Sequence, residues 1–325
     1  MGLWSWQVFL NWLCRKYNSL VNGIEAICQI GNSDDAMKPE TSNHSGIYYM
    51  LLGMFMFTVN DAIGKWLVTD FSVGQLLAIR SWAALVILFP LLAKKGELTK
   101  LFTLENPKLH CIRLFFVVSE ASCFFWAVRY LPLADTFMIY LAAPIFVTAL
   151  SPFMLGEKVG VFRWMAVLVG FGGVVLIFPP SEAALSLPAF VAVAGSLGLA
   201  FVMVLTRKLR EADPVRLITL QTLAMAVAAS FTLPVVWITP SGFEFMLFCL
   251  LGLVATMAHF LINHAMRTSP AAVVAPFQYS SIIWAMILGY FFWNETPTLS
   301  SLLGAGIVVG SGVFILYREA RQKNL

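Results

Sequence analysis

The sequence predicts an all-α polytopic membrane protein with about ten transmembrane helices, arranged as two inverted five-helix repeats. Three observations predict this fold class. The chain is 59% hydrophobic and 12% charged, with a mean hydropathy of +0.82, which is more apolar than the surface of a soluble globular protein tolerates. Its apolar residues form runs of roughly 18 to 24, the length at which a helix crosses about 30 Å of hydrocarbon. The second half of the sequence also repeats features of the first half.

The first 45 residues form an N-terminal leader without a full span. An apolar, tryptophan-rich piece is followed by the basic pair Arg15 and Lys16, then by a polar stretch. No small-residue cleavage site succeeds the apolar piece, so a signal peptide is not expected. Because Met37 opens a compact polar segment just before the first run, we expect a start site set too far upstream. An interfacial helix is the alternative interpretation.

From Gly46 onward each apolar run predicts one helix, and loop residues such as Gly96, Pro180 and Pro214 separate the runs. A cytoplasmic tail is expected over residues 318–325. The ten runs cover residues 46–68, 73–93, 109–130, 134–155, 161–178, 188–206, 215–238, 243–266, 271–293 and 299–317.

The distribution of basic residues predicts the orientation, because Lys and Arg are retained on the cytoplasmic side of a membrane. With a cytoplasmic N-terminus, the outer segments carry little more than Lys65 and Arg129. Both termini are therefore expected in the cytoplasm, with the protein in a bacterial cell inner membrane. The inner segments and tail would hold Lys94, Lys95, Lys100, Lys108, Arg113, Lys158, Arg163, Arg207, Lys208, Arg210, Arg216, Arg267, Arg318, Arg321 and Lys323.

An internal repeat appears when the second half is shifted back by about 138 positions. Aligned Arg, Pro and Glu residues are rare in membrane spans and indicate a duplication, with repeats over 46–178 and 188–317. Each repeat holds an odd number of spans, so the second is inverted, an architecture typical of secondary transporters. The residues Ala127, Arg129, Pro132, Ala134, Phe153, Glu157 and Gly172 fall on Ala265, Arg267, Pro270, Ala272, Phe291, Glu295 and Gly310.

On these features the chain resembles the drug/metabolite transporter superfamily, specifically proteins with two EamA domains, from Gly46 to about Tyr317. The segments NDAIGKWLV at residues 60–68 and GQLLAIRSWAA at residues 74–84 are similar to bacterial riboflavin importers and to S-adenosylmethionine carriers. The resemblance implies riboflavin uptake as the first expectation. S-adenosylmethionine transport, and amino-acid or drug export, are the alternatives.

Charged residues inside the first three spans are the first candidates for substrate binding or coupling, because an ionisable side chain in hydrocarbon is costly unless it is paired or hydrated. Asp61 and Lys65 lie four residues apart and could form an intrahelical ion pair or contact the substrate, with Asn60 beside them. Arg80 needs an acidic partner, carbonyl groups or an anionic substrate group. Glu120 would suit either proton coupling or pairing with Arg80.

Polar and aromatic residues of later spans complete the candidate site. Gln278 follows Pro276, where a helix is expected to be interrupted. A metal site is not expected, because the two histidines of the eighth span lack further ligands at suitable spacing. Glu157 and Glu295 lie at helix ends and are expected to stabilise the fold by pairing or capping. The further candidates are Tyr140, which could stack on a heterocycle as Trp284 could, and the hydrogen-bonding residues His259, Asn263 and Gln278.

The sequence predicts a central cavity between the halves, formed by the first four spans of each, with the fifth and tenth spans peripheral. Without a nucleotide-binding motif or a catalytic motif, neither a cofactor nor an enzymatic activity is expected. The expected partners are a small-molecule substrate and the lipid bilayer, but no nucleic acid. Glycines of the fifth and tenth spans would serve close packing or a homodimer seam. An assembly subunit is the competing class, and lipid-facing charged residues would favour it.

Overall fold

The computed structural model describes residues 39–104, 106–156, 160–177, 186–209, 212–269 and 274–323, and all regular structure within them is helical. The predicted leader lies outside these residues up to Lys38, as does Glu157. A helical segment occupies part of each of the ten predicted runs. The helices are α2 (Pro39–Asp70), α3 (Val73–Lys94), α4 (Pro107–Tyr130), α5 (Leu133–Tyr140), α6 (Ala143–Leu155), α7 (Val161–Ile177), α8 (Leu187–Lys208), α9 (Pro214–Ser230), α10 (Leu233–Val236), α11 (Gly242–Thr268), η2 (Ala275–Tyr279), α13 (Ser280–Trp293) and α14 (Leu299–Lys323).

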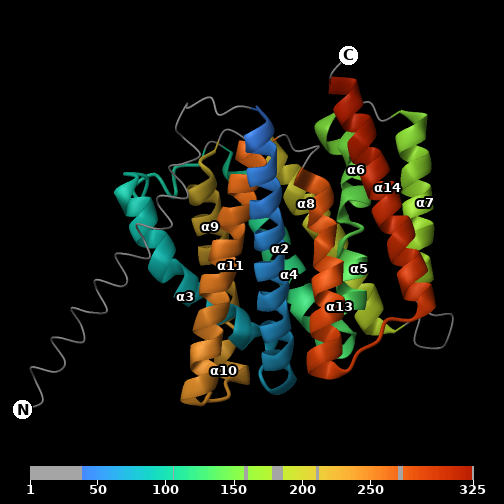
Figure 1. The fold of residues 1–325 in the computed structure, drawn as a ribbon. Coiled ribbons are helices and arrows are strands. Elements are labelled where there is room, and N and C mark those ends of the chain that lie inside the picture. Colours follow the sequence, from blue (N-terminus) through green and yellow to red (C-terminus); the bar gives the residue numbers. More distant parts are fainter. Residues whose placement is uncertain are drawn as a thin grey trace, which may run out of the picture.

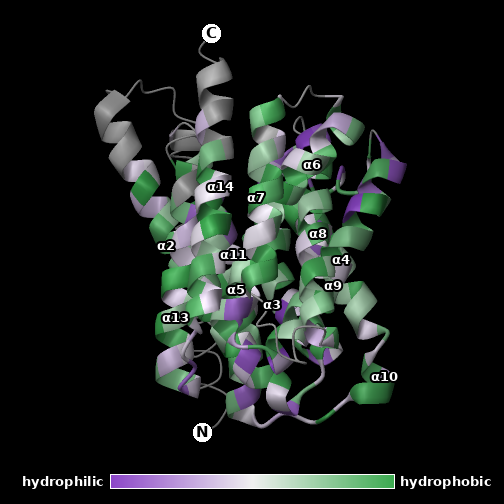
Figure 2. Cartoon of the chain, turned by 90° about the vertical axis from the view of Figure 1, so that its right-hand side faces the viewer, coloured by the Kyte–Doolittle hydropathy of each residue, from purple (hydrophilic) through white to green (hydrophobic). Residues whose placement is uncertain are grey.

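Six helical segments of the described chain are long and apolar enough to cross a membrane. Three shorter apolar helices accompany them over Trp164–Leu176, Pro214–Ser230 and Leu299–Phe314. Figure 2 shows hydrophobic residues over most of the middle of the bundle and hydrophilic residues mainly towards its ends. The protein is therefore a multi-pass membrane protein. The six long segments are Ser45–Asp70, Val73–Lys94, Pro107–Tyr130, Leu133–Leu155, Leu187–Lys208 and Gly242–Met266.

Helices α2 and α14 extend furthest beyond their predicted limits. Helix α2 begins at Pro39, inside the stretch expected to be a polar leader, and α14 continues to Lys323, through the expected tail. Both extensions are polar, and a polar helix can continue past the apolar part of its span because water satisfies its exposed groups. Hydropathy marks the apolar part of a helix but does not mark where the helix ends.

Two spans are interrupted at corresponding positions of the two halves. Helix α5 ends at Tyr140 and α6 begins at Ala143, while the 3₁₀ helix η2 ends at Tyr279 and α13 begins at the next residue. The shift of about 138 positions that relates the halves carries Leu141 onto Tyr279. The predicted interruption near Pro276 is confirmed, and the first half has its own near Pro144.

The two halves are intertwined, because each major helix pair takes one helix from each half. Helix α2 packs against α11, and α4 packs against α8. Helix α3 packs against α9, and α7 packs against α14 at one edge of the bundle (Figure 1). The shift of about 138 positions places α2 on α8 and α4 on α11. The α2–α11 pair and the α4–α8 pair are therefore equivalent in the two halves. Residues from different halves therefore meet throughout the interior.

Close contact at the α7–α14 pair depends on a glycine. A Cβ on Gly173 would lie 2.9 Å from the backbone oxygen of Gly304 and equally close to the side chain of Ile307. Without that atom the two helices can approach backbone to backbone, as small residues allow in membranes. The fifth and tenth predicted spans thus pair with each other at the edge of the bundle.

Candidate functional site

Three charged residues predicted from the first three spans lie together inside the bundle. Asp61 is on α2, Arg80 on α3 and Glu120 on α4, and each is half-buried. Arg80 interacts electrostatically with both carboxyl groups, and the two carboxyl groups interact with each other. We call Asp61, Arg80 and Glu120 the central charged group. Its two acids and one base give it a formal charge of −1 when all three are ionised.

No ion pair within 4.0 Å joins Arg80 to either acid in the described part of the chain. Asp61 instead accepts a hydrogen bond from Asn60, with 2.9 Å between Nδ2 and Oδ1. The guanidinium of Arg80 lies over the ring of Phe125, 4.9 Å from its centroid, and that ring is buried. Aromatic contact supports a guanidinium without using its hydrogen-bond donors. The central charged group therefore keeps unused hydrogen-bonding capacity that a substrate could engage.

Small residues on the opposite half let the backbone come close to this group. A Cβ added to Gly252 of α11 would collide with the backbone oxygen of Arg80. A Cβ on Gly198 of α8 would lie 3.2 Å from the Cβ of Glu120. The site is thus bounded by α8 and α11 as well as by the three helices that supply its charges.

His259 of α11 adds a polar side chain from the second half. Its Nδ1 lies 2.8 Å from the backbone oxygen of Ala255, and because a carbonyl oxygen only accepts, Nδ1 must be the donor. The ring packs edge-on against Phe57 of α2, with centroids 4.8 Å apart. His259 also interacts electrostatically with Arg80, which places it beside the central charged group. Its Nε2 is left to accept a hydrogen bond when the ring is neutral.

Other predicted candidates serve packing or their own helix. The Tyr140 hydroxyl donates to the backbone oxygen of Glu120 at 3.0 Å, and the buried ring packs edge-on against Phe124. Asn263 donates to the backbone oxygen of His259 at 2.9 Å. Tyr140 therefore links α5 to α4 within the core.

Gln278 and Trp284 lie on η2 and α13 and are half-buried. Trp284 packs edge-on against Phe55 of α2, with centroids 5.0 Å apart. Its indole nitrogen is buried and donates to no described group. Trp284 therefore borders α2 from the second half, and η2, the element that carries Gln278, also packs against α2.

Lys65 does not pair with Asp61 in the described chain, so the expected intrahelical ion pair is wrong. Its ammonium group forms an ion pair with Glu295 and donates to the backbone oxygen of Leu131 at 2.9 Å. Glu295 also accepts the backbone N–H of Leu133 at 2.8 Å. Glu295 therefore both pairs with a base and caps a helix, and the helix that it caps is α5 of the first half. Position along α2 explains the correction, since Lys65 reaches the end of the bundle where α4 ends and α5 begins.

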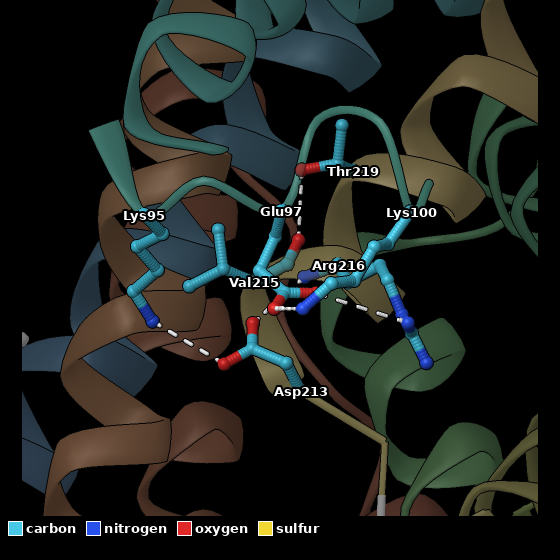
Figure 3. Close-up of polar contacts among 7 residues, drawn as sticks. All are labelled: Lys95, Glu97, Lys100, Asp213, Val215, Arg216 and Thr219. Carbon is cyan, nitrogen blue, oxygen red and sulfur yellow. Dashed lines mark hydrogen bonds and ion pairs between the residues drawn. The ribbon is translucent and has the colours of Figure 1, made fainter. Parts of the chain in front are cut away.

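The opposite end of the bundle, where α4 and α9 begin, carries a set of exposed and half-exposed charges (Figure 3). Lys95, the C-cap residue of α3, lies 3.3 Å from Asp213, the N-cap residue of α9. Glu97 lies 2.9 Å from Lys100 and 3.8 Å from Arg216 of α9. We call this the basic end. Its ion pairs join the loop after α3 to the second half.

Arg113 was counted as a basic residue near a loop, but it lies within α4 and is only 4% exposed. Its Nε donates to Thr206 Oγ1 at 2.8 Å and its Nη2 donates to Gln221 Oε1 at 2.7 Å. Hydropathy assigned Arg113 to the membrane edge because the apolar run was judged to begin just before it. The signal available in the sequence is its spacing, because Arg113 precedes Glu120 by seven residues, which is about two turns along the same helical face.

Among the described residues, no group of three or more His, Cys, Asp or Glu side chains could hold a metal ion. The interior does contain the central charged group, His259 and Arg113, which lies two turns before Glu120 on α4. These groups supply charges of both signs inside the bundle.

The EamA-like transporter family model matches residues 44–178 and 186–317. An S-adenosylmethionine uptake transporter of Rickettsia conorii is 26% identical over 294 residues, covering 90% of this chain and 98% of its own. A riboflavin transporter of Vibrio cholerae is 25% identical over 85% of this chain and 94% of its own. A pseudopaline exporter of Pseudomonas aeruginosa is 23% identical over 82% and 93%, respectively.

The fold is also similar to a solved crystal structure, with a TM-score of 0.59 and 15% sequence identity. That similarity covers 89% of this chain and 100% of the other. At this identity it supports the fold alone. The family match and the transporter relatives together identify a transporter of a small molecule and not an enzyme.

Proposed function

Because the chain belongs to the EamA-like transporter family, we propose that it is a secondary transporter with ten spans, which moves a small organic metabolite across the bacterial inner membrane by alternating access. The intertwined helix pairs and the interruptions at corresponding positions support this mechanism. A substrate cavity between the halves would be bounded by α2, α3, α4, α8 and α11, around the central charged group.

The substrate that fits the central charged group best is S-adenosylmethionine. Two carboxylates and one guanidinium have a net affinity for a cation, and this molecule carries a sulfonium and an ammonium group. Asp61 and Glu120 would face those cations, while Arg80 limits the repulsion between the two acids. The relative from Rickettsia conorii, matched over 90% of this chain, supports the same substrate.

Riboflavin, the first expectation from the sequence, is the second candidate. The Vibrio cholerae relative supports it, and aromatic residues near α2 such as Trp284 could pack against a flat ring system. The flavin ring and ribityl chain carry no cation to engage Asp61 and Glu120. The charge of the site therefore favours S-adenosylmethionine.

We propose that the basic end and both termini face the cytoplasm. Lys95 and Lys100 at this end, and the basic residues in the last turns of α14, support this orientation under the positive-inside rule. Single cysteines placed at Lys100 and at Thr239 in a cysteine-free background would test it. A membrane-impermeant thiol reagent applied to intact cells should label position 239 and spare position 100, and the reverse pattern would invert the orientation.

The function is tested by counterflow in proteoliposomes, because counterflow does not depend on the natural direction of transport. Liposomes preloaded with unlabelled S-adenosylmethionine should accumulate the labelled compound when they contain the protein. Asp61→Asn should abolish this accumulation. Asp70→Asn, the same change at the exposed end of the same helix, is the matched control and should leave it intact.

The possible outcomes separate the candidates. Counterflow of labelled riboflavin without that of S-adenosylmethionine would replace the proposed substrate by the second candidate. Absence of both would leave amino-acid or drug export as the function to examine. Loss of activity in Asp70→Asn as well as Asp61→Asn would remove the assignment of Asp61 to the site.

A further inference from the structure

Arg113 is a buried cation whose partners in the described chain are all neutral. It donates to the hydroxyl of Thr206 and the amide oxygen of Gln221, and no described acid pairs with it. Arg80 has two acids within electrostatic range, and Lys65 has Glu295. A buried charge without a counter-charge is costly unless a ligand supplies one. Arg113 is therefore the place in the interior where an anion would be best accommodated.

Unused donors surround this position. The Nη1 atom of Arg113 is buried and has no hydrogen-bond partner. The same is true of Nδ1 of His110, a residue that is 2% exposed, and of Nε of Arg216. His110 lies one turn before Arg113 on α4 and interacts electrostatically with both arginines, while Arg216 also pairs with Glu97 at 3.8 Å. Guanidinium donors in such a setting are suited to a carboxylate.

Arg113 is also next to the central charged group. It lies seven residues before Glu120 on α4, which is about two turns and roughly 10 Å along one helical face. His259 interacts electrostatically with both Arg80 and Arg113, so both arginines lie within electrostatic range of one side chain. A substrate with a cation near Glu120 could therefore direct an anionic group towards Arg113.

We propose that Arg113, with His110 and Arg216 beside it, binds the carboxylate of the transported substrate. The inference rests on the proposed function and adds a second binding position to it. S-adenosylmethionine has its carboxylate only a few bonds from its sulfonium, so the central charged group would hold the cations while Arg113 holds the anion. The site would then recognise the amino-acid end of the substrate through charges of both signs.

The test compares S-adenosylmethionine with its decarboxylated analogue, which keeps the sulfonium and the adenosine. In wild-type proteoliposomes the analogue should inhibit counterflow at least tenfold more weakly than S-adenosylmethionine does. Arg113→Gln should raise the KM for S-adenosylmethionine at least tenfold and make the two compounds equally effective inhibitors. Arg129→Gln, the same change at the exposed far end of α4, should alter neither value.

Each result bears on one proposal. If wild type carries S-adenosylmethionine but does not distinguish it from the analogue, Arg113 does not bind its carboxylate, whatever the fate of the variants. Arg113→Gln that keeps the wild-type KM and preference would overturn the inference too. If wild type does not carry S-adenosylmethionine, the proposed substrate is wrong, and the carboxylate site inferred from that substrate is overturned as well. The wild-type comparison stands even where Arg113→Gln does not fold.

Discussion

Lys65 of α2 and Glu295, which follows α13, form an ion pair that links the first half of the molecule to the second. The same carboxylate accepts the backbone N–H that opens α5, and the same ammonium group donates to the backbone oxygen of Leu131. Both side chains are largely buried, at 7% and 18% exposed. Four segments from both halves therefore converge on two side chains at the end opposite the basic end.

We expect the loss of this pair to destabilise the protein substantially. Glu295→Gln leaves the Lys65 ammonium group buried without its counter-charge, which should cost about 3 kcal/mol and lower the Tm in detergent by roughly 6 °C. Glu295→Ala should cost more, because it also leaves the N–H of Leu133 without an acceptor.

Lys100→Gln is the control for this prediction. It removes an ion pair with Glu97 in which Lys100 is 59% exposed, and such surface pairs contribute little. Its Tm should stay within about 1 °C of wild type. An unchanged Tm in Glu295→Gln would mean that the pair does not hold the two halves together.

The glycine at position 252 is predicted to be required for the approach of α11 to α3. A Cβ at this position would overlap the backbone oxygen of Arg80, and a backbone atom cannot rotate away as a side chain does. Gly252→Ala should therefore separate the helices, cost about 2 kcal/mol and reduce counterflow by displacing Arg80. Gly306→Ala on α14 is the control, because nothing lies within 4 Å of its added Cβ. Equal Tm and transport in the two variants would contradict the close approach.

The sequence was sufficient for the parts of the fold that depend on composition and periodicity. Apolar runs located the helices, and the intramembrane position of Asp61, Arg80 and Glu120 identified three residues that do lie together. Lys65 was assigned wrongly because helical spacing describes neighbours on one helix only. Its partner Glu295 lies 230 positions away, and that contact depends on how the halves intertwine.

Arg113 was missed for a different physical reason. A positive-inside count treats every base near a span end as hydrated, whereas packing of α4 against α8 and α9 buries this one. A hydropathy value describes the average preference of a residue type for water or hydrocarbon, and it contains no information about which residues surround it in the fold. The polar residues Thr206 and Gln221 that stabilise it come from the second half, so only the assembled structure brings them together.

Asp213 is predicted to act mainly as a helix cap. Its carboxylate accepts the backbone N–H of Arg216 at 3.1 Å and also contacts Lys95 at 3.3 Å. Asp213→Asn keeps a cap acceptor and loses only a partly exposed ion pair, so its Tm should be close to wild type. Asp213→Ala loses both contacts and should cost about 1 kcal/mol, measured as a fall in Tm. Similar losses in the two variants would show that the ion pair, and not the cap, is the important contact.

Arg80 is predicted to require its guanidinium group and not only a positive charge. The planar group lies over the Phe125 ring, 4.9 Å from the centroid, within electrostatic range of two acids that it does not contact directly. Lysine keeps the charge but loses the planar contact and carries a compact, strongly hydrated ammonium group. Arg80→Lys should therefore lower kcat/KM for counterflow by about tenfold at equal protein abundance and unchanged Tm, which corresponds to about 1.4 kcal/mol. Phe125→Leu should lower kcat/KM in wild type but cause little further loss in Arg80→Lys, because the stacked contact is already gone. Additive losses in the double variant would mean that Phe125 acts through packing alone.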